Sequence, residues 1–156
     1  MPHVYVDADD CPVKEEVFRV AKRYSLHVTL VDNRWKPTPD DERIQMVVVP
    51  DQLDAADDWI AEHIQADDIV ICQDIPLAAR CLKRDARVIN SRGRLLTDDD
   101  IGSALATRNL MSSLRESGTM TGGPKPFSPR DRSNFLQSLD QQIHAARKSR
   151  RRRRPE

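Results

Sequence analysis

The stretch His3-Val4-Tyr5-Val6-Asp7-Ala8-Asp9-Asp10-Cys11-Pro12 decides how the chain folds. Its first part is apolar and β-branched, which is typical of a buried strand. Three carboxylates follow within four residues, and the proline after them suits the first turn of a helix. The stretch therefore predicts a strand, an acidic turn and a helix. Its acids would lie at the carboxyl end of the strand, where open α/β sheets bind ligands.

The acids of this turn have two interpretations. Asp7 and Asp9 would share a side of an extended turn, because side-chain direction repeats every two residues. Neighbouring carboxylates repel, which raises a pKa unless a cation or a proton intervenes, and a hard divalent cation relieves the repulsion through oxygen ligands. The simpler interpretation is that Asp9 or Asp10 only caps the helix that follows.

Length and composition predict one soluble globular domain. The chain has 156 residues, of which 38% are hydrophobic and 32% charged, enough for a sizeable core. It shows neither a bilayer-spanning apolar run nor a signal-peptide pattern, so we expect a cytoplasmic protein with no membrane partner. Cys11, Cys72 and Cys81 lack Cys-x-x-Cys spacing, which argues against a disulfide framework and a structural zinc site.

The formal net charge of zero conceals an uneven distribution. Seven of the 25 basic residues lie within 147–154 and one of the 25 acids is Glu156, so residues 1–146 carry a net charge of −6. We therefore expect a single domain over 1–146 and a basic, disordered tail over 147–156 that contacts nucleic acid. The alternative is a tail that only improves solubility.

The rest of the chain alternates strand and helix patterns. Apolar runs predict further strands at 27–31, 44–49, 68–72 and 87–89. Helical spacing predicts helices at 13–24, 53–64, 75–82, 97–114 and 130–148, with a flexible loop at 118–129. Thr97 is the expected N-cap of the fourth helix, with Asp100 three residues later. This alternation predicts an α/β fold of three layers, α/β/α, around a mostly parallel five-stranded sheet.

Acids from separate segments converge in this topology. Asp74 follows the predicted strand at 68–72, which is almost wholly apolar and therefore central in a parallel sheet. Asp7, Asp9 and Asp74 would then lie at one sheet edge and hold Mg²⁺ or Mn²⁺, which stabilises charge on a phosphoryl oxygen. Asp54 and Asp57 share a helix face and could add a ligand. The alternatives are N-caps for the strand-end acids and a favourable helix dipole for the helical ones.

Several motifs carry a family resemblance. They are Val6-Asp-Ala-Asp-Asp-Cys-Pro-Val-Lys14, Asp68-Ile-Val-Ile-Cys-Gln-Asp-Ile-Pro-Leu-Ala-Ala79, Ser91-Arg-Gly93, Leu105-Ala-Thr-Arg108 and Gly123-Pro-Lys-Pro-Phe-Ser-Pro-Arg-Asp-Arg132. The chain thus resembles the YaiI/YqxD family of uncharacterised bacterial proteins over nearly its whole length except the arginine tail. That family is related to the PIN-like and NYN nuclease folds, which implies a PIN-like domain with a divalent-metal-dependent ribonuclease site.

The resemblance also implies roles for particular acids. Asp7 and Asp74 match the strand-end acids, and Asp57 matches the helix-borne acid, with Asp54 in reserve. A further acid is expected after the fifth strand, where this chain has Asn90, and the displaced run Asp98 to Asp100 lies nearby. We therefore predict Asp7, Asp9, Asp57 and Asp74 as catalytic residues, with Asp7, Asp9 and Asp74 as ligands of Mg²⁺ or Mn²⁺.

A second set of polar residues could contact the phosphates of an RNA substrate, because arginine pairs bidentately with phosphate. The candidates are Asn33, Arg34, Ser91, Arg92, Arg108, Lys125, Arg130 and Arg132. Surface ion pairs are the alternative role for the arginines.

Two other functions stay open at this point. The chain could be an RNA-binding or regulatory module without catalysis, which should be indifferent to loss of its acids. Asp7-x-Asp9 after a strand also resembles the haloacid-dehalogenase phosphatase motif. That motif has Thr or Val where this chain has Cys11, and it needs a Ser or Thr closing a later strand, where this chain has Asp32 and Asp74.

Overall fold

Five parallel strands and one antiparallel strand form a central sheet in the order β3-β2-β1-β4-β5-β6. The computed structural model describes residues 1–9, 11–103 and 126–153. The parallel strands are β1 (Val4–Asp7), β2 (Val28–Asp32), β3 (Ile44–Val48), β4 (Ile69–Ile71) and β5 (Arg87–Ile89). The sixth, β6 (Leu95–Leu96), pairs antiparallel with β5.

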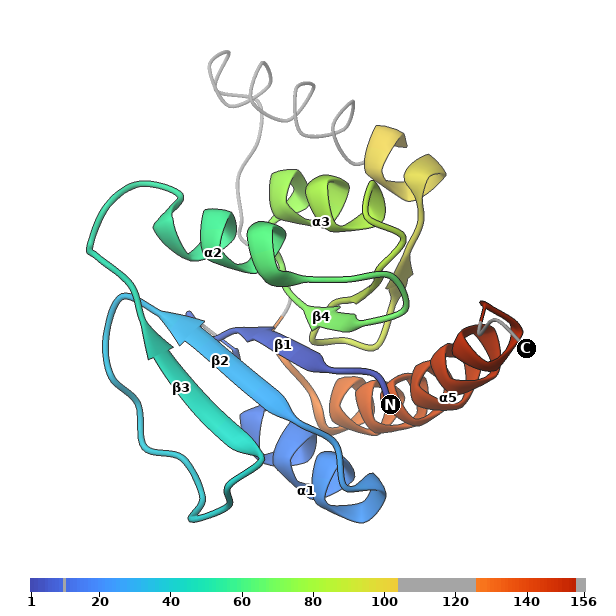
Figure 1. Cartoon of the computed structure of the whole chain (residues 1–156), viewed down its shortest axis with the longest axis horizontal. Helices are drawn as coiled ribbons and strands as arrows, with labels where there is room; N and C mark the ends of the chain where they lie inside the picture. Colours follow the sequence, from blue (N-terminus) through green and yellow to red (C-terminus); the bar gives the residue numbers. More distant parts are fainter. Residues whose placement is uncertain (10, 104–125, 154–156) are drawn as a thin grey trace.

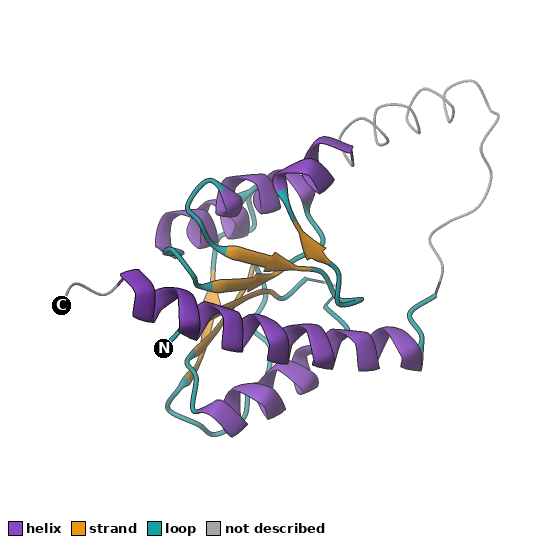
Figure 2. Cartoon of the chain, turned by 90° about the vertical axis from the view of Figure 1, so that its right-hand side faces the viewer, coloured by secondary structure: helices purple, strands orange, loops and turns teal. Residues whose placement is uncertain are grey.

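Helices cover both faces of the sheet and complete three layers (Figures 1 and 2). One face packs against α1 (Lys14–Tyr24) and α5 (Pro129–Arg153), and the other against α2 (Ala55–His63) and α3 (Ile75–Leu82). A further helix begins at Asp98 and is described to residue 103. None of the helices described is long and apolar enough to cross a bilayer.

The central strand β1 contributes to both cores. Val4 and Val6 belong to the cluster shared with α1 and α5, whereas Tyr5 between them belongs to the cluster shared with α2 and α3. This alternation follows from the two-residue period of a strand, and it explains why a strand buried on both faces is apolar throughout. On the α5 side, Phe135 and Ile143 are fully buried.

The predicted three-layer α/β/α fold with five parallel strands is confirmed. The sequence analysis missed β6, because a strand of two residues shows no periodic pattern. The Thr97 cap is confirmed: the Thr97 backbone N–H donates to Asp100 Oδ2 (3.0 Å), and the Asp100 N–H donates to Thr97 Oγ1 (3.3 Å). The remainder of the helix predicted for 97–114 and most of the loop predicted for 118–129 lie outside the described residues.

The C-terminal helix differs from the expected disordered tail. α5 continues to Arg153, beyond the predicted domain end at residue 146. Arg147 donates to the Tyr24 backbone carbonyl oxygen (3.3 Å), and its guanidinium carbon lies 4.9 Å from the centre of the Tyr24 ring. Arg150 donates to Asp68 Oδ1 (2.6 Å), whose side chain is only 3% exposed. A buried carboxylate needs a cation, so part of the basic run serves as internal counter-charge rather than as a solvated arm.

Candidate functional site

Four aspartates gather where β1 and β4 end, and we call them the acid edge: Asp7, Asp9, Asp57 and Asp74. Asp7 is the last residue of β1, and Asp74 is the N-cap of α3, two residues beyond Cys72, which follows β4. Parallel pairing of the two strands, with Val6 opposite Ile71, brings their carboxyl ends together. Asp57 lies in the first turn of α2, and exposed Asp9 lies in the turn after β1.

Electrostatics couples these side chains. The pKa of Asp7 is raised to about 7. Burial is the largest cause, and the carboxylates of Asp57, Asp74, Asp9 and Asp32 add to the rise. Burial likewise raises the pKa of Asp57 to about 6, with added repulsion from Asp74. The contributions from neighbouring carboxylates require charges that lie close together, so the structure brings the predicted catalytic acids into one electrostatic cluster.

Helix capping explains part of the cluster. Asp74 Oδ1 accepts a hydrogen bond from the Leu77 backbone N–H (2.9 Å), so the capping interpretation holds for that oxygen. Asp9 is not the N-cap of α1, because that position is Val13, which forms no side-chain cap bond. Asp10 lies outside the described residues.

The helical acids differ from one another. Asp54, the reserve candidate, is the N-cap of α2 in a left-handed conformation (φ 62°) and makes no side-chain cap bond. Asp58 pairs with Arg80 at 2.7 Å on the surface. Of the three acids at the start of α2, Asp57 is the partly buried one, and its pKa is raised.

The donor set suits one kind of cation. In the described part of the chain, no three His, Cys, Asp or Glu side chains are arranged as a metal cage. Magnesium does not require such a cage, since it usually takes one or two carboxylates together with waters and substrate phosphates. Asp7 and Asp74 offer only hard oxygen donors, and no hydrogen-bond donor among the described residues reaches the Asp7 carboxylate. Carboxylate oxygens of this kind are ligands that Mg²⁺ and Mn²⁺ accept.

Lys36 is a residue of the site region that the sequence reasoning missed. Its ammonium lies 2.6 Å from Oδ2 of the buried Asp32 and donates to the Ala8 carbonyl oxygen at 2.8 Å. These bonds fasten the segment after β2 to the turn between Asp7 and Asp9. Their four-residue spacing, Asp32 to Lys36, was the only signal in the sequence, and it is ambiguous outside a helix.

Several predicted phosphate contacts have structural partners instead. Ser91 is buried and accepts a hydrogen bond from Gln73 Nε2. Arg92 pairs with Asp131 at 2.7 Å, and Arg132 pairs with the buried Glu16. In the part of the chain that is described, Arg92 and Arg132 therefore form ion pairs with other segments of the fold, which was the alternative to phosphate binding.

The other predicted contacts fall into two groups. Asn33 Nδ2 donates to Asp51 Oδ1 at 2.7 Å, whereas Arg34 and Arg130 are exposed. Arg108 and Lys125 lie outside the described residues. Within the described residues, the predicted phosphate contacts are thus reduced to exposed Arg34, on the connection after β2, and exposed Arg130, near the start of α5.

Asn90 does not substitute for the acid expected after the fifth strand. Its Oδ1 accepts from the backbone N–H groups of Arg92 and Arg94, both at 3.0 Å, and so builds the turn between β5 and β6. Asp100 caps the helix that begins at Asp98 and pairs with Arg94 at 2.7 Å. Both side chains therefore serve local structure.

Gly93 allows the turn between β5 and β6 to lie against the backbone of α5. Its φ is +87°, and a Cβ at this position would come within 2.5 Å of the Asn134 carbonyl oxygen. The β5–β6 turn therefore packs directly onto the backbone of α5, which only glycine permits.

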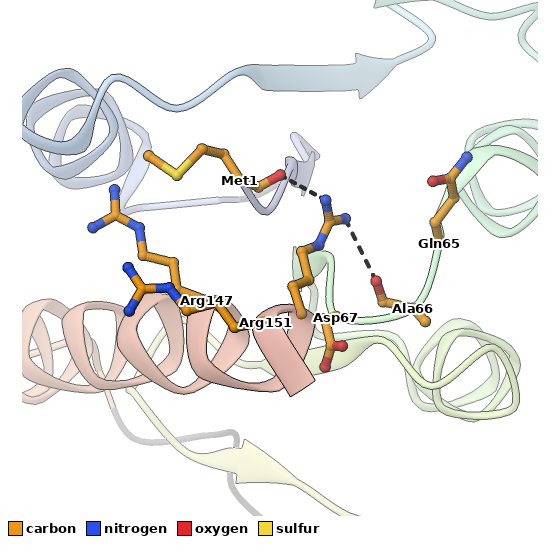
Figure 3. Close-up of a pocket in the computed structure, with 7 residues that line it drawn as sticks. Met1, Gln65, Ala66, Asp67, Arg147 and Arg151 are labelled. Carbon is orange, nitrogen blue, oxygen red and sulfur yellow. Dashed lines mark hydrogen bonds between the residues drawn. The ribbon is translucent and has the colours of Figure 1, made fainter. Parts of the chain in front are cut away.

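A cavity of about 810 Å³ lies at the other end of the strands (Figure 3). Its lining comes from the residues before β1 and β4 and from the end of α5: Met1, Gln65, Ala66, Asp67, Arg147, Arg150 and Arg151. Arg150 crosses it, donating to the carbonyl oxygens of Met1 (2.8 Å) and Ala66 (3.5 Å). The sequence reasoning gave no sign of this cavity, because it depends on where α5 ends.

Comparison with known proteins gives a consistent result. A family model described as "Uncharacterized BCR, YaiI/YqxD family" matches residues 5–145. The chain is 55% identical to a UPF0178 protein of Paramagnetospirillum magneticum, over 95% of this chain and 98% of that protein. It is 53% identical to one of Rhodospirillum rubrum, over 94% and 99%, and 57% identical to one of Azorhizobium caulinodans, over 88% and 86%. No solved structure gives a significant match.

Proposed function

The chain belongs to the YaiI/YqxD family, and from the acid edge we propose that it is a divalent-metal-dependent nuclease, PIN-like in fold, that acts on RNA. The observation that carries this proposal is the clustering of Asp57 and Asp74 around Asp7, whose pKa burial and these neighbouring carboxylates together raise to about 7. Perturbed carboxyl groups at the carboxyl ends of parallel strands are typical of functional sites.

Each acid has a proposed role. Asp7 and Asp74 would hold Mg²⁺ or Mn²⁺, with Asp9 at the exposed rim. A bound divalent cation supplies charge stabilisation at a phosphoryl oxygen. Asp57, with a pKa raised to about 6, is suited to take the proton from an attacking water, because general bases work best with a pKa near the operating pH. The P–O bond to the leaving oxygen of the phosphodiester then breaks, and that oxygen takes a proton from solvent.

Charge distribution supports RNA as the substrate. The acid edge repels phosphates unless a cation is bound, so cations must also lie outside it. Exposed Arg34 and Arg130, and the arginines at 151–154, would supply these phosphate contacts. The tail keeps its proposed RNA role for exposed Lys148 and for the residues beyond Arg150, since Arg147 and Arg150 bind the folded body.

The test is cleavage of a 5′-labelled single-stranded RNA with Mg²⁺, with Mn²⁺ and with EDTA. Asp57→Asn should lower the rate by roughly 10²-fold or more if it is the base. Asp74→Asn should also abolish metal-dependent cleavage, while Asn retains the cap of α3. The matched control is Asp58→Asn, which changes the exposed neighbour that pairs with Arg80 and should leave the rate unchanged.

Two outcomes would contradict the proposal. Cleavage that persists in EDTA, or at full rate in Asp57→Asn, would place the chemistry elsewhere. RNA binding without cleavage by the wild type in either metal would favour the alternative of a non-catalytic RNA-binding module.

A further inference from the structure

Two large apolar side chains stand in solvent on the two connections that flank β3. Trp35 is 70% exposed and Leu53 is 93% exposed. Trp35 lies on the connection from β2 to β3, and Leu53 on the connection from β3 to α2, both starting at the left of the sheet in Figure 1. The hydrogen bond from Asn33 to Asp51 (2.7 Å) joins these connections. The aromatic side chain therefore stands on a surface that is held in place.

The segment carrying Trp35 is anchored on both sides. Asn33 bonds across to the next connection, and Lys36 bonds to the Ala8 carbonyl oxygen (2.8 Å) and to buried Asp32. Ala8 lies between Asp7 and Asp9, so the residue next to Trp35 touches the backbone of the acid edge. The indole is thereby presented close to the site without packing into either core.

The second tryptophan shows the contrast. Trp59 stacks on His63 with ring centres 3.8 Å apart and lies 6.2 Å from Tyr5, as expected of a packing residue. Trp35 has no such ring contact among the described residues. Its exposure therefore has no explanation in the stability of the fold.

We propose that Trp35 is a nucleobase-stacking subsite, which holds an unpaired base of RNA next to the phosphate at the acid edge. This inference rests on the proposed function for its substrate class. Sites for single-stranded nucleic acid combine aromatic faces, on which bases stack, with neighbouring cations that follow the backbone. Here exposed Arg34 precedes the tryptophan. Stacking needs a splayed base, so the subsite selects single-stranded over duplex RNA.

The experiment uses intrinsic fluorescence. The chain has two tryptophans, so a Trp59→Phe background leaves Trp35 as the sole emitter. This protein is titrated in EDTA at low salt with octa-adenylate, with a self-complementary RNA duplex and with inorganic polyphosphate, which has no bases. We expect octa-adenylate alone to quench the Trp35 emission strongly.

Affinities measured by anisotropy complete the test. Trp35→Ala should weaken octa-adenylate binding roughly 5-fold to 150-fold, the range for losing one aromatic–base stack. Trp35→Phe should retain most of the affinity, and polyphosphate binding should be the same in all variants. Thermal melting checks that each variant is folded.

The overturning results are distinct from failure of the proposed function. Unchanged octa-adenylate affinity in Trp35→Ala would overturn the stacking subsite and would instead favour a protein partner for this surface. An equal loss of polyphosphate affinity would overturn it as well. A wild type that never cleaves RNA, yet loses octa-adenylate affinity in Trp35→Ala, would refute the nuclease and leave the subsite standing.

Discussion

Replacing Asp7 by Asn should stabilise the metal-free protein at alkaline pH. The folded chain keeps the Asp7 proton until a pKa of about 7, whereas a carboxyl with the ordinary value of 3.8 ionises far earlier. Between these values the folded state binds more protons than the unfolded state, so wild-type stability falls as pH rises through this window. Above pH 7 the whole penalty is present, and Asp7→Asn removes it.

The size of the effect follows from the shift. A difference of about three pKa units corresponds to at most about 4 kcal/mol. Asp7 is only partly buried, and solvent screening reduces the expected gain to about 1–2 kcal/mol at pH 8. The gain should be small near pH 4, because the unfolded carboxyl is only about half ionised there, and it should vanish at lower pH, where both states carry the proton. With a urea m-value of about 2 kcal/mol/M, the unfolding midpoint at pH 8 should rise by roughly 0.5–1 M.

The assay is urea unfolding in EDTA at pH 4 and pH 8, repeated with Mn²⁺ and with Na⁺ at equal ionic strength. Mn²⁺ at a hundredfold excess over Kd should stabilise the wild type by about 2.7 kcal/mol and stabilise Asp7→Asn much less. The control Asp9→Asn changes an exposed acid that is one of the smaller causes of the Asp7 shift, and it should raise the metal-free midpoint much less than Asp7→Asn does. A metal-free Asp7→Asn protein that is less stable than wild type at pH 8 would refute the reasoning, because Asp7 would then be a structural group.

Arg150→Met removes the counter-charge of buried Asp68 and should lower the free energy of unfolding by about 2–4 kcal/mol, seen as a lower melting temperature. The control Arg151→Met changes an exposed arginine and should leave the melting temperature unchanged. Equal melting temperatures of the two variants would contradict the ion pair. Gly93→Ala should lower the free energy of unfolding, measured with urea, by about 2 kcal/mol or more, because φ is +87° and the α5 backbone blocks a Cβ. The control Gly102→Ala places its Cβ in open space and should be neutral or stabilise the fold by up to about 1 kcal/mol. Deleting residues 151–156 should leave a folded chain and flatten the slope of log K against log salt for RNA by about 3 at most, since four arginines are lost; an unchanged slope would exclude them as RNA contacts.

The strands and most helices could be predicted because their patterns are local. Strands β1 and β4 are apolar runs that end in acids, and the alternation with helices leaves few topologies open. β6 could not be predicted, because its two residues pair only once α5 and the turn at Gly93 hold them in place. The fate of the basic run was also hidden, since composition cannot show that Asp68 is buried and needs Arg150.

The residues of the candidate site also differ in how far the sequence could predict them. Asp7 and Asp74 could be identified from their positions after strands and Asp57 through the family resemblance, and the topology brings the three together. Arg92 and Arg132 looked like phosphate ligands, because an arginine in a sequence carries no sign of a partner 39 or 116 positions away. Single-sequence reasoning finds acids that repel one another more readily than it finds cations that are already paired.

The position of α5 has a consequence for how this protein is made. α5, which together with α1 buries one face of the sheet, is synthesised after every strand that it covers, and Arg150 bonds to the carbonyl of Met1, 149 positions earlier. While residues 1–128 emerge from the ribosome, the apolar face that Phe135 and Ile143 will cover has no cover from α5. The domain therefore completes its fold only after α5 has emerged, and until then its nascent chain presents a surface that chaperones recognise and that aggregates when they fail.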